Sequence, residues 1–198
     1  MATKIETIIN NLLTFYNFKD KIVLHVGAGG GQIIDYAKIA QHTIAIDIDD
    51  SAIEILRYNV KEKNLENKIS IFKQDYYQLK QKCDVTFFEF CLHEMSDSRL
   101  AIEYAKNLSP DILIIDHMPE SKWAWYVGET KLVQDSWRTI EKMSIKKKLV
   151  IDTKQFFSDF QELKKKLFSC GDEVQKRILE FEHKTNFIIP MQYGLVLI

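Results

Sequence analysis

The stretch VLHVGAGGGQ at residues 23–32, together with IAIDID at residues 44–49, decides the fold class. The first stretch holds four of the seven glycines and directly follows an apolar run that is typical of a strand. Glycine permits positive φ and leaves no Cβ between the backbone and a ligand. The second stretch places an acid, Asp47, 20 residues after Gly27. We therefore expect a ligand to lie against the glycine loop and Asp47 to accept hydrogen bonds from the hydroxyls of a ribose.

The rest of the sequence alternates apolar runs rich in β-formers with amphipathic stretches, as βαβ units do. We predict strands at residues 22–26, 43–47, 69–73, 85–90 and 111–115, and helices at residues 5–18, 32–40, from 50 or 51, and from 96 or 98 to 107. After Pro119 the pattern is mostly helical, with one short candidate strand at residues 148–151. FIIP at 187–190 and YGLVLI at 193–198 suggest a closing hairpin. This order predicts an α/β, doubly wound, mostly parallel sheet.

Length and charge limit the function classes. A chain of 198 residues fits one domain, 1–198, in which 1–20 carries an N-terminal helix and 119–184 forms a helical cap over the site. Lys and Arg total 27 against 28 for Asp and Glu, so no global basic field attracts nucleic acid. No run of about 18 apolar residues is present, which argues against a membrane span.

The sequence predicts no metal site. Cys83, Cys91 and Cys170 form no CxxC pair, which favours reduced thiols and a cytoplasmic location. His93-Glu94 begins an HExxH-like stretch, but Asp97 occupies the place of the second histidine.

The glycine spacing separates two kinds of nucleotide ligand. Dinucleotide-binding enzymes use GxGxxG, but Gln32 occupies the position of the third glycine here. Gln32 therefore counts against an NAD-type oxidoreductase, which we keep as the alternative enzyme class. A binding protein that has the fold but no catalytic activity is the alternative outside enzymes.

Four segments together resemble the class I S-adenosylmethionine-dependent methyltransferases of small molecules. They are VLHVGAGGG, IAIDID, FKQDYY at 72–77 and DVTFFEFCLHEMSD at 84–97, and the resemblance extends over residues 22 to about 118. It implies a Rossmann-like methyltransferase fold of seven strands, with an antiparallel C-terminal hairpin and a helical insertion between strands five and six. It also implies S-adenosylmethionine as cofactor and a small molecule as methyl acceptor, and it leaves the acceptor's identity and the oligomeric state open.

The resemblance assigns roles to individual residues. The cofactor-binding residues would be Gly27, Ala28, Gly29, Gly31, Asp47, Ile48, Asp75, Tyr76, Glu89 and Phe90. Within this set, Asp47 would hold the ribose, Ile48 would pack on the adenine, and Asp75 would face its amino group. Glu89 and Phe90 would border the methionyl group. Asp75 has an alternative role as the cap of a turn. His25 stands where most members of the family carry an acid, and its alternative role is that of a histidine packed within the sheet.

On the acceptor side, the segment Leu92-His93-Glu94-Met95 resembles the one that follows strand four in small-molecule methyltransferases. That likeness makes His93 the candidate residue that touches the acceptor or takes its proton. Aromatic side chains after the fifth strand suit an apolar acceptor, or alternatively anchor the cap to the sheet. The candidate acceptor-binding residues are His117, Trp123, Trp125 and Tyr126.

Overall fold

The computed structural model describes residues 5–198, in which seven strands form a single sheet of order β3-β2-β1-β4-β5-β7-β6. The strands are β1 Ile22–Val26, β2 His42–Asp47, β3 Ile69–Lys73, β4 Val85–Glu89, β5 Asp111–His117, β6 Lys147–Asp159 and β7 Thr185–Leu197. The first five pair in parallel, and β7 lies antiparallel between β5 and β6. The predicted seven-stranded, mostly parallel α/β fold is confirmed.

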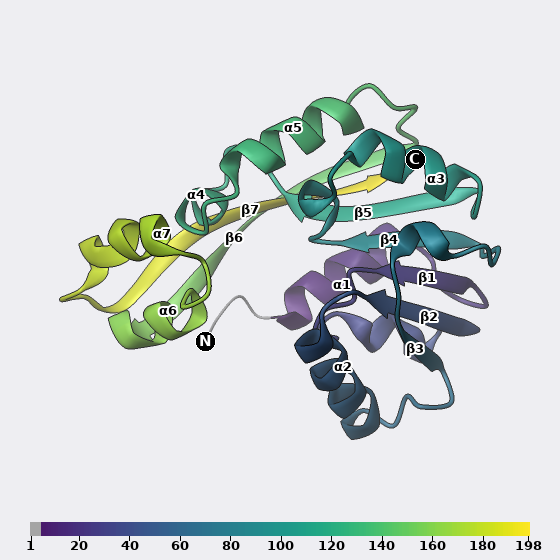
Figure 1. The fold of residues 1–198 in the computed structure, drawn as a ribbon, viewed down its shortest axis with the longest axis horizontal. Helices are drawn as coiled ribbons and strands as arrows, with labels where there is room; N and C mark the ends of the chain where they lie inside the picture. Colours follow the sequence, from purple (N-terminus) through teal and green to yellow (C-terminus); the bar gives the residue numbers. More distant parts are fainter. Residues whose placement is uncertain (1–4) are drawn as a thin grey trace.

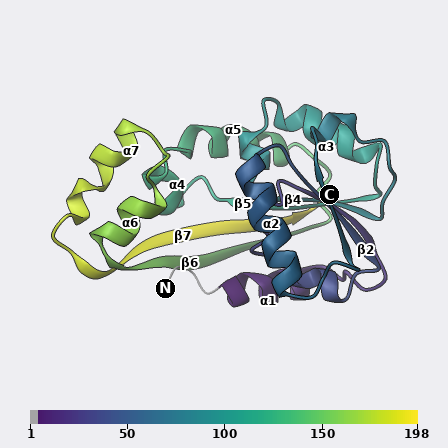
Figure 2. The same ribbon diagram turned by 60° about the horizontal axis from the view of Figure 1, so that its bottom comes forward.

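Helices cover both faces of the sheet. The α-helices are α1 Ile5–Phe15, α2 Asp50–Glu62, α3 Ser98–Lys106, α4 Lys122–Tyr126, α5 Thr130–Ile140, α6 Phe160–Lys166 and α7 Asp172–Arg177. Short 3-10 helices are η1 Ile34–Lys38, η2 Tyr76–Gln78, η3 Leu92–Glu94 and η4 Ile178–Phe181. Figure 2 shows α1 on one side of the sheet and α3 and α5 on the other. Of the predicted N-terminal helix 1–20, residues 1–4 lie outside the described part of the chain.

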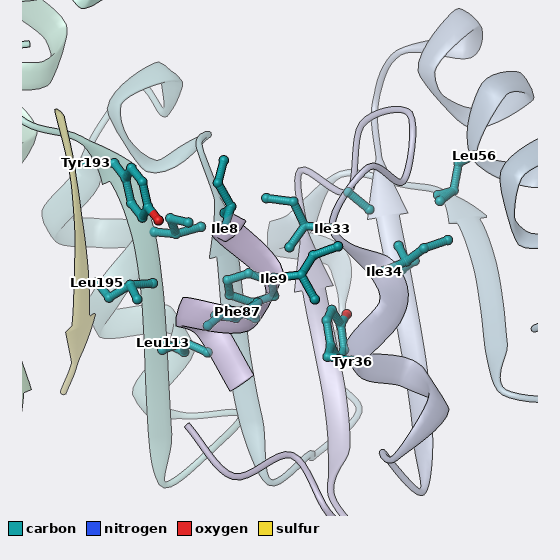
Figure 3. Packing of buried hydrophobic residues seen from close by; sticks show 14 of the residues in the cluster. Ile8, Ile9, Ile33, Ile34, Tyr36, Leu56, Phe87, Leu113, Tyr193 and Leu195 are labelled. Carbon is teal, nitrogen blue, oxygen red and sulfur yellow. The ribbon is translucent and has the colours of Figure 1, made fainter. Parts of the chain in front are cut away.

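Each face of the sheet buries its own apolar cluster. On one face, α1 and η1 pack over β1, β4 and β5, and Figure 3 shows Ile8, Ile9 and Tyr36 in one cluster with Phe87. On the other face, α3 and α5 bury their apolar sides, and Trp137 is 2% exposed. Strands buried on both faces explain the continuous apolar runs in the sequence.

The helix predicted at residues 32–40 is wrong. Only the 3-10 helix η1 forms there. The residues after it are held to the chain before β1, because the Asp20 amide donates to the Ile39 carbonyl and the Gln41 amide donates to the Lys21 carbonyl. No α-helix N-terminus therefore follows the glycines.

The closing hairpin predicted from 187–190 and 193–198 is also wrong, because those residues form one long strand, β7. Its partner is β6, of which the sequence pattern indicated only residues 148–151. Pro190 misled the prediction, since proline interrupts most strands. It is tolerated here because β5 pairs only with Tyr193–Leu197, so that β7 has an open edge at Pro190.

The segment 119–184 is not purely helical, since it contains β6 as well as α4 to α7. In Figure 1, β6 and β7 run together beyond the rest of the sheet toward α6 and α7. Within residues 5–198 we find no helix with both the length and the apolar character that a bilayer crossing requires.

Candidate active site

A cleft of about 730 Å³ opens where β1, β2 and β4 end. Eight of the ten residues predicted to bind the cofactor line it: Gly27, Gly29, Asp47, Ile48, Asp75, Tyr76, Glu89 and Phe90. Ala28 and Gly31 do not line it. None of residues 119–184, all of which the structure describes, lines it either. The carboxyl ends of parallel strands thus gather residues that are far apart in the sequence.

Two glycines are required by close packing around the loop. Gly27 has φ +65°, and a Cβ there would lie 2.5 Å from the Cβ of Cys91. Gly31 has φ +71°, and its Cβ would lie 2.6 Å from a methyl carbon of Leu56. A Cβ on Gly29 would meet nothing closer than 3.9 Å. The loop is therefore pressed against the protein at both ends and open to the cleft at Gly29.

Asp47 ties the end of β2 to the glycine loop. Its Oδ2 accepts a hydrogen bond from the Gly29 amide at 2.9 Å, and its Oδ1 accepts one from the Asp49 amide at 3.0 Å. A carboxylate offers about four lone-pair sites, so each oxygen can accept a further hydrogen bond from a ligand in the cleft. Next to it, the side chain of Ile48 is 73% exposed, which leaves an apolar surface at the cleft for a flat ring.

Asp75 and Tyr76, which follow β3, also line the cleft. Asp75 caps η2 by accepting a hydrogen bond from the Tyr77 amide at 3.0 Å, so the capping role considered from the sequence is present. Its side chain is also exposed at the cleft. Tyr76 is buried, and its hydroxyl donates to the Ala101 carbonyl at 3.1 Å. Tyr76 therefore offers the cleft its ring and not its hydroxyl.

His25 is fully buried between two polar partners. Its Nδ1 lies 2.9 Å from the Tyr36 hydroxyl, and its ring stacks on Phe87. Its Nε2 lies 2.9 Å from Glu89 Oε2, although the pair lacks the geometry of a hydrogen bond. With a carboxylate beside Nε2, the hydrogen belongs on that nitrogen and Nδ1 accepts from Tyr36. His25 is thus both packed in the sheet and in contact with a residue of the cleft.

Tyr36→Phe tests this arrangement. Removing the hydroxyl leaves Nδ1 of the buried His25 without its partner, so we expect the free energy of unfolding to fall by about 1–3 kcal/mol. Urea unfolding measures the change. Tyr58→Phe is the matched control because Tyr58 is 64% exposed. Equal stability of the two variants would show that the hydrogen bond between Tyr36 and His25 does not stabilise the fold.

Phe90 has a strained backbone at the end of β4. Its φ is +45°, a region that residues with a side chain rarely adopt. Its amide donates to the Ile115 carbonyl at 2.8 Å, and its ring lies 4.8 Å from that of His117. Such strain concentrates at functional sites. Phe90 directly follows β4 and lines the cleft.

His93 does not line the cleft, and two carboxylates hold its ring. Its Nδ1 lies 2.6 Å from Asp116 Oδ1, and its Nε2 lies 3.3 Å from Glu129 Oε2. Burial alone would lower the pKa of His93, but the hydrogen bond to Asp116 and the proximity of Glu129 outweigh it and raise that pKa to about 10. Burial raises the pKa of neighbouring Glu94, and the negative charges of Glu129 and Asp116 raise it further.

Asp116 organises this region from the end of β5. Besides His93 Nδ1, it accepts hydrogen bonds from the amides of His93 and His117, at 3.2 and 2.8 Å. Burial lowers the pKa of His117.

The sequence analysis did not predict Asp116, Glu129 or Tyr36 as residues of this region. The only signal for Asp116 was a charged residue at the end of an apolar run, and nothing in the spacing connected Glu129 or Tyr36 with a histidine.

The aromatic residues predicted to bind the acceptor lie away from the cleft. Trp123 is buried and stacks on Phe157, with ring centroids 5.9 Å apart. Trp125 and Tyr126 line a separate cavity of about 370 Å³ near Pro190. The structure thus gives Trp123 the anchoring position that was the alternative to acceptor binding.

Comparison with known proteins agrees with this geometry. Residues 23–111 match the family described as Methyltransferase domain, which spans the glycine loop, Asp47 and the end of β4. Over these residues the chain is similar to methyltransferase domains. No match was found among curated protein sequences.

Solved structures show the methyltransferase fold over nearly the whole chain. A proposed methyltransferase from Bacillus halodurans is 12% identical, with a TM-score of 0.69 over 96% of this chain and 97% of that one. Magnesium protoporphyrin IX methyltransferase from Synechocystis with bound S-adenosylhomocysteine is 14% identical, with a TM-score of 0.59 over 97% and 80%. The [4+2]-cyclase SpnF is 15% identical, with a TM-score of 0.66 over 97% and 79%. At these identities the likeness shows the methyltransferase fold alone.

Proposed function

We propose that this protein transfers a methyl group from S-adenosylmethionine to a small-molecule acceptor. The observation that carries the proposal is the single cleft in which the glycine loop, Asp47 and Glu89 meet. Its volume of about 730 Å³ lies within the range of small-molecule sites.

The charge of the cleft suits this cofactor. Asp47, Asp75, Glu89 and Glu94 all line it, and S-adenosylmethionine carries a sulfonium and an ammonium group. We assign the ribose to Asp47, the adenine to Ile48 and Asp75, and the methionyl group to Glu89 and Phe90. The opening at Gly29 lets the ligand lie on the loop backbone. Ala28 and Gly31 support this loop, because the Ala28 amide donates to Ile46 and Gly31 packs on Leu56.

When bound, S-adenosylmethionine would supply an activated methyl group, which passes in line from its sulfur to an acceptor atom, with S-adenosylhomocysteine as the leaving group. The protein then has to hold the acceptor at attack distance and exclude water. A base is needed only where the acceptor loses a proton. With a pKa of about 10, His93 is already protonated near neutrality, and its buried side chain does not line the cleft, so we assign it no proton transfer in this state.

Small acceptors fit the rest of the chain better than nucleic acid, because the net charge is −1. We also propose a cytoplasmic location, in keeping with three free cysteines. The oxidoreductase alternative is disfavoured by Gln32, which stands where the dinucleotide pattern needs glycine.

Release of S-adenosylhomocysteine in the presence of candidate acceptors tests the proposal. We expect its formation with at least one class of small O, N, C or S nucleophile, above the rate without acceptor. Because SpnF has the same fold and is a cyclase, binding of the cofactor alone does not establish methyl transfer. Cofactor binding without turnover over a broad acceptor panel would favour a non-catalytic binding protein.

A further inference from the structure

Three potential metal ligands meet beside the cleft, which one of them, Glu94, lines. A ring nitrogen of His93 and carboxylate oxygens of Glu94 and Glu129 all lie within 4.8 Å of one another, and the Nε2 of His93 is the nitrogen nearest Glu129. His93 and Glu94 come from η3, whereas Glu129 immediately precedes α5. We propose that these three residues bind a divalent transition-metal ion, a site that the methyltransferase function does not by itself require.

The state of His93 points to such a ligand independently of the carboxylates. Its side chain is 1% exposed, and its Nε2 has no hydrogen-bond partner among residues 5–198. That nitrogen faces Glu129, with which it makes an ion-pair distance of 3.3 Å but no hydrogen bond. A buried ring nitrogen without a hydrogen bond is costly unless a ligand completes its surroundings.

Asp116 supplies the support that metal-binding histidines normally have. It holds Nδ1 of His93 at 2.6 Å, which fixes the ring with Nε2 toward Glu129. Metal-ligating histidines almost always bond through their other nitrogen to a carboxylate or carbonyl in this manner. Asp116 is itself fully buried and fixed by two backbone amides, so the support is rigid.

The charges around His93 also favour a cation. Asp116 and Glu129 both contact its imidazole, and Glu94 adds a third carboxylate close by. A divalent ion between the imidazole and these carboxylates would balance their negative charge.

The donor set indicates the kind of metal. One imidazole and two carboxylates suit Zn²⁺ or Mn²⁺, whereas Ca²⁺ and Mg²⁺ prefer oxygen ligands throughout. Three protein ligands leave coordination positions open, as in catalytic metal sites. Because Glu94 lines the cleft, these positions would face the space in which a ligand lies.

Calorimetric titration of the chelator-treated full-length protein with Zn²⁺ and Mn²⁺, separately, tests the proposal. We expect one ion per chain. Because even residues that only support a metal ligand change affinity by about 10–100-fold, Glu129→Gln and Glu94→Gln should each weaken binding at least tenfold. Both residues are at least partly exposed, so these variants are expected to fold. The matched control is Glu103→Gln, an exposed acid of α3 paired with Lys106, which should bind as the parent does.

A second readout reports on the histidine itself. In ¹⁵N spectra, the Nε2 resonance of His93 should shift on adding Zn²⁺ to the parent and to the Glu103→Gln variant, but not to the Glu129→Gln variant at the same concentration. Equal metal binding by the parent and both ligand variants, or no binding by the parent, would overturn the proposal. S-adenosylmethionine is titrated in parallel, because binding of that ligand without metal would refute this site alone and leave the proposed function standing.

Discussion

Asp47→Ala is expected to weaken the binding of S-adenosylmethionine by about 1–3 kcal/mol, the cost of hydrogen bonds to a charged group. This loss corresponds to a factor of roughly 5 to 150 in Kd. The physical reason is twofold: the ribose loses its acceptor, and the glycine loop loses the carboxylate that holds the Gly29 amide. Calorimetry gives the affinity, and urea unfolding shows whether the protein remains folded.

Two further variants separate these contributions. Asp50→Ala removes an acid from the first turn of α2 that pairs with exposed Lys73 and does not line the cleft, so the affinity should be unchanged. Asp47→Asn keeps the shape of the side chain but can place its NH₂ group against the Gly29 amide, which is also a donor. The affinity of this variant for S-adenosylmethionine should therefore lie between those of the parent and of Asp47→Ala. An affinity of Asp47→Ala equal to that of the parent would show that the ribose lies elsewhere.

Gly27→Ala should lower the free energy of unfolding by about 2–5 kcal/mol. Positive φ costs a residue with a side chain about 1–2 kcal/mol, and forcing a methyl group against packed atoms costs about 1–3 kcal/mol more. The new Cβ would lie 2.5 Å from Cys91 Cβ and 2.6 Å from its sulfur. Relief of this contact moves η3 or the loop, so we also expect cofactor binding to be lost.

Gly29→Ala is the matched control, since its φ of +49° is also positive but its Cβ would have no contact closer than 3.9 Å. Its free energy of unfolding should fall only by the cost of the backbone conformation, about 1–2 kcal/mol. The double variant Gly27→Ala, Cys91→Gly should recover part of the stability lost by Gly27→Ala. Equal stability of the Gly27→Ala and Gly29→Ala variants would contradict the close packing of the loop on Cys91.

The sequence was sufficient where local pattern and function coincide. Apolar runs buried on both faces identified the five parallel strands, and the spacing from Gly27 to Asp47 placed both residues on one cleft. It failed where packing overrode local pattern. After Gly31 the chain forms only the 3-10 helix η1 in place of the predicted helix. Pro190 led us to divide a strand whose open edge tolerates proline.

The side-chain partners in the site could not be predicted for a different reason. His25 contacts Tyr36 from η1 and Glu89 from β4, and His93 contacts Glu129, which lies between α4 and α5. Such contacts depend on how the connections cross the sheet, and no spacing in the sequence encodes them. The same holds for Trp125 and Tyr126, which follow β5 closely in sequence yet line another cavity.

The most direct test of the assignment is calorimetric titration of the full chain with S-adenosylmethionine, S-adenosylhomocysteine and NAD, each separately. Our account predicts that both sulfur ligands bind with Kd values below about 1 mM, or more favourably than roughly −4 kcal/mol, and that NAD does not. Binding of NAD with no measurable binding of either sulfur ligand would contradict it.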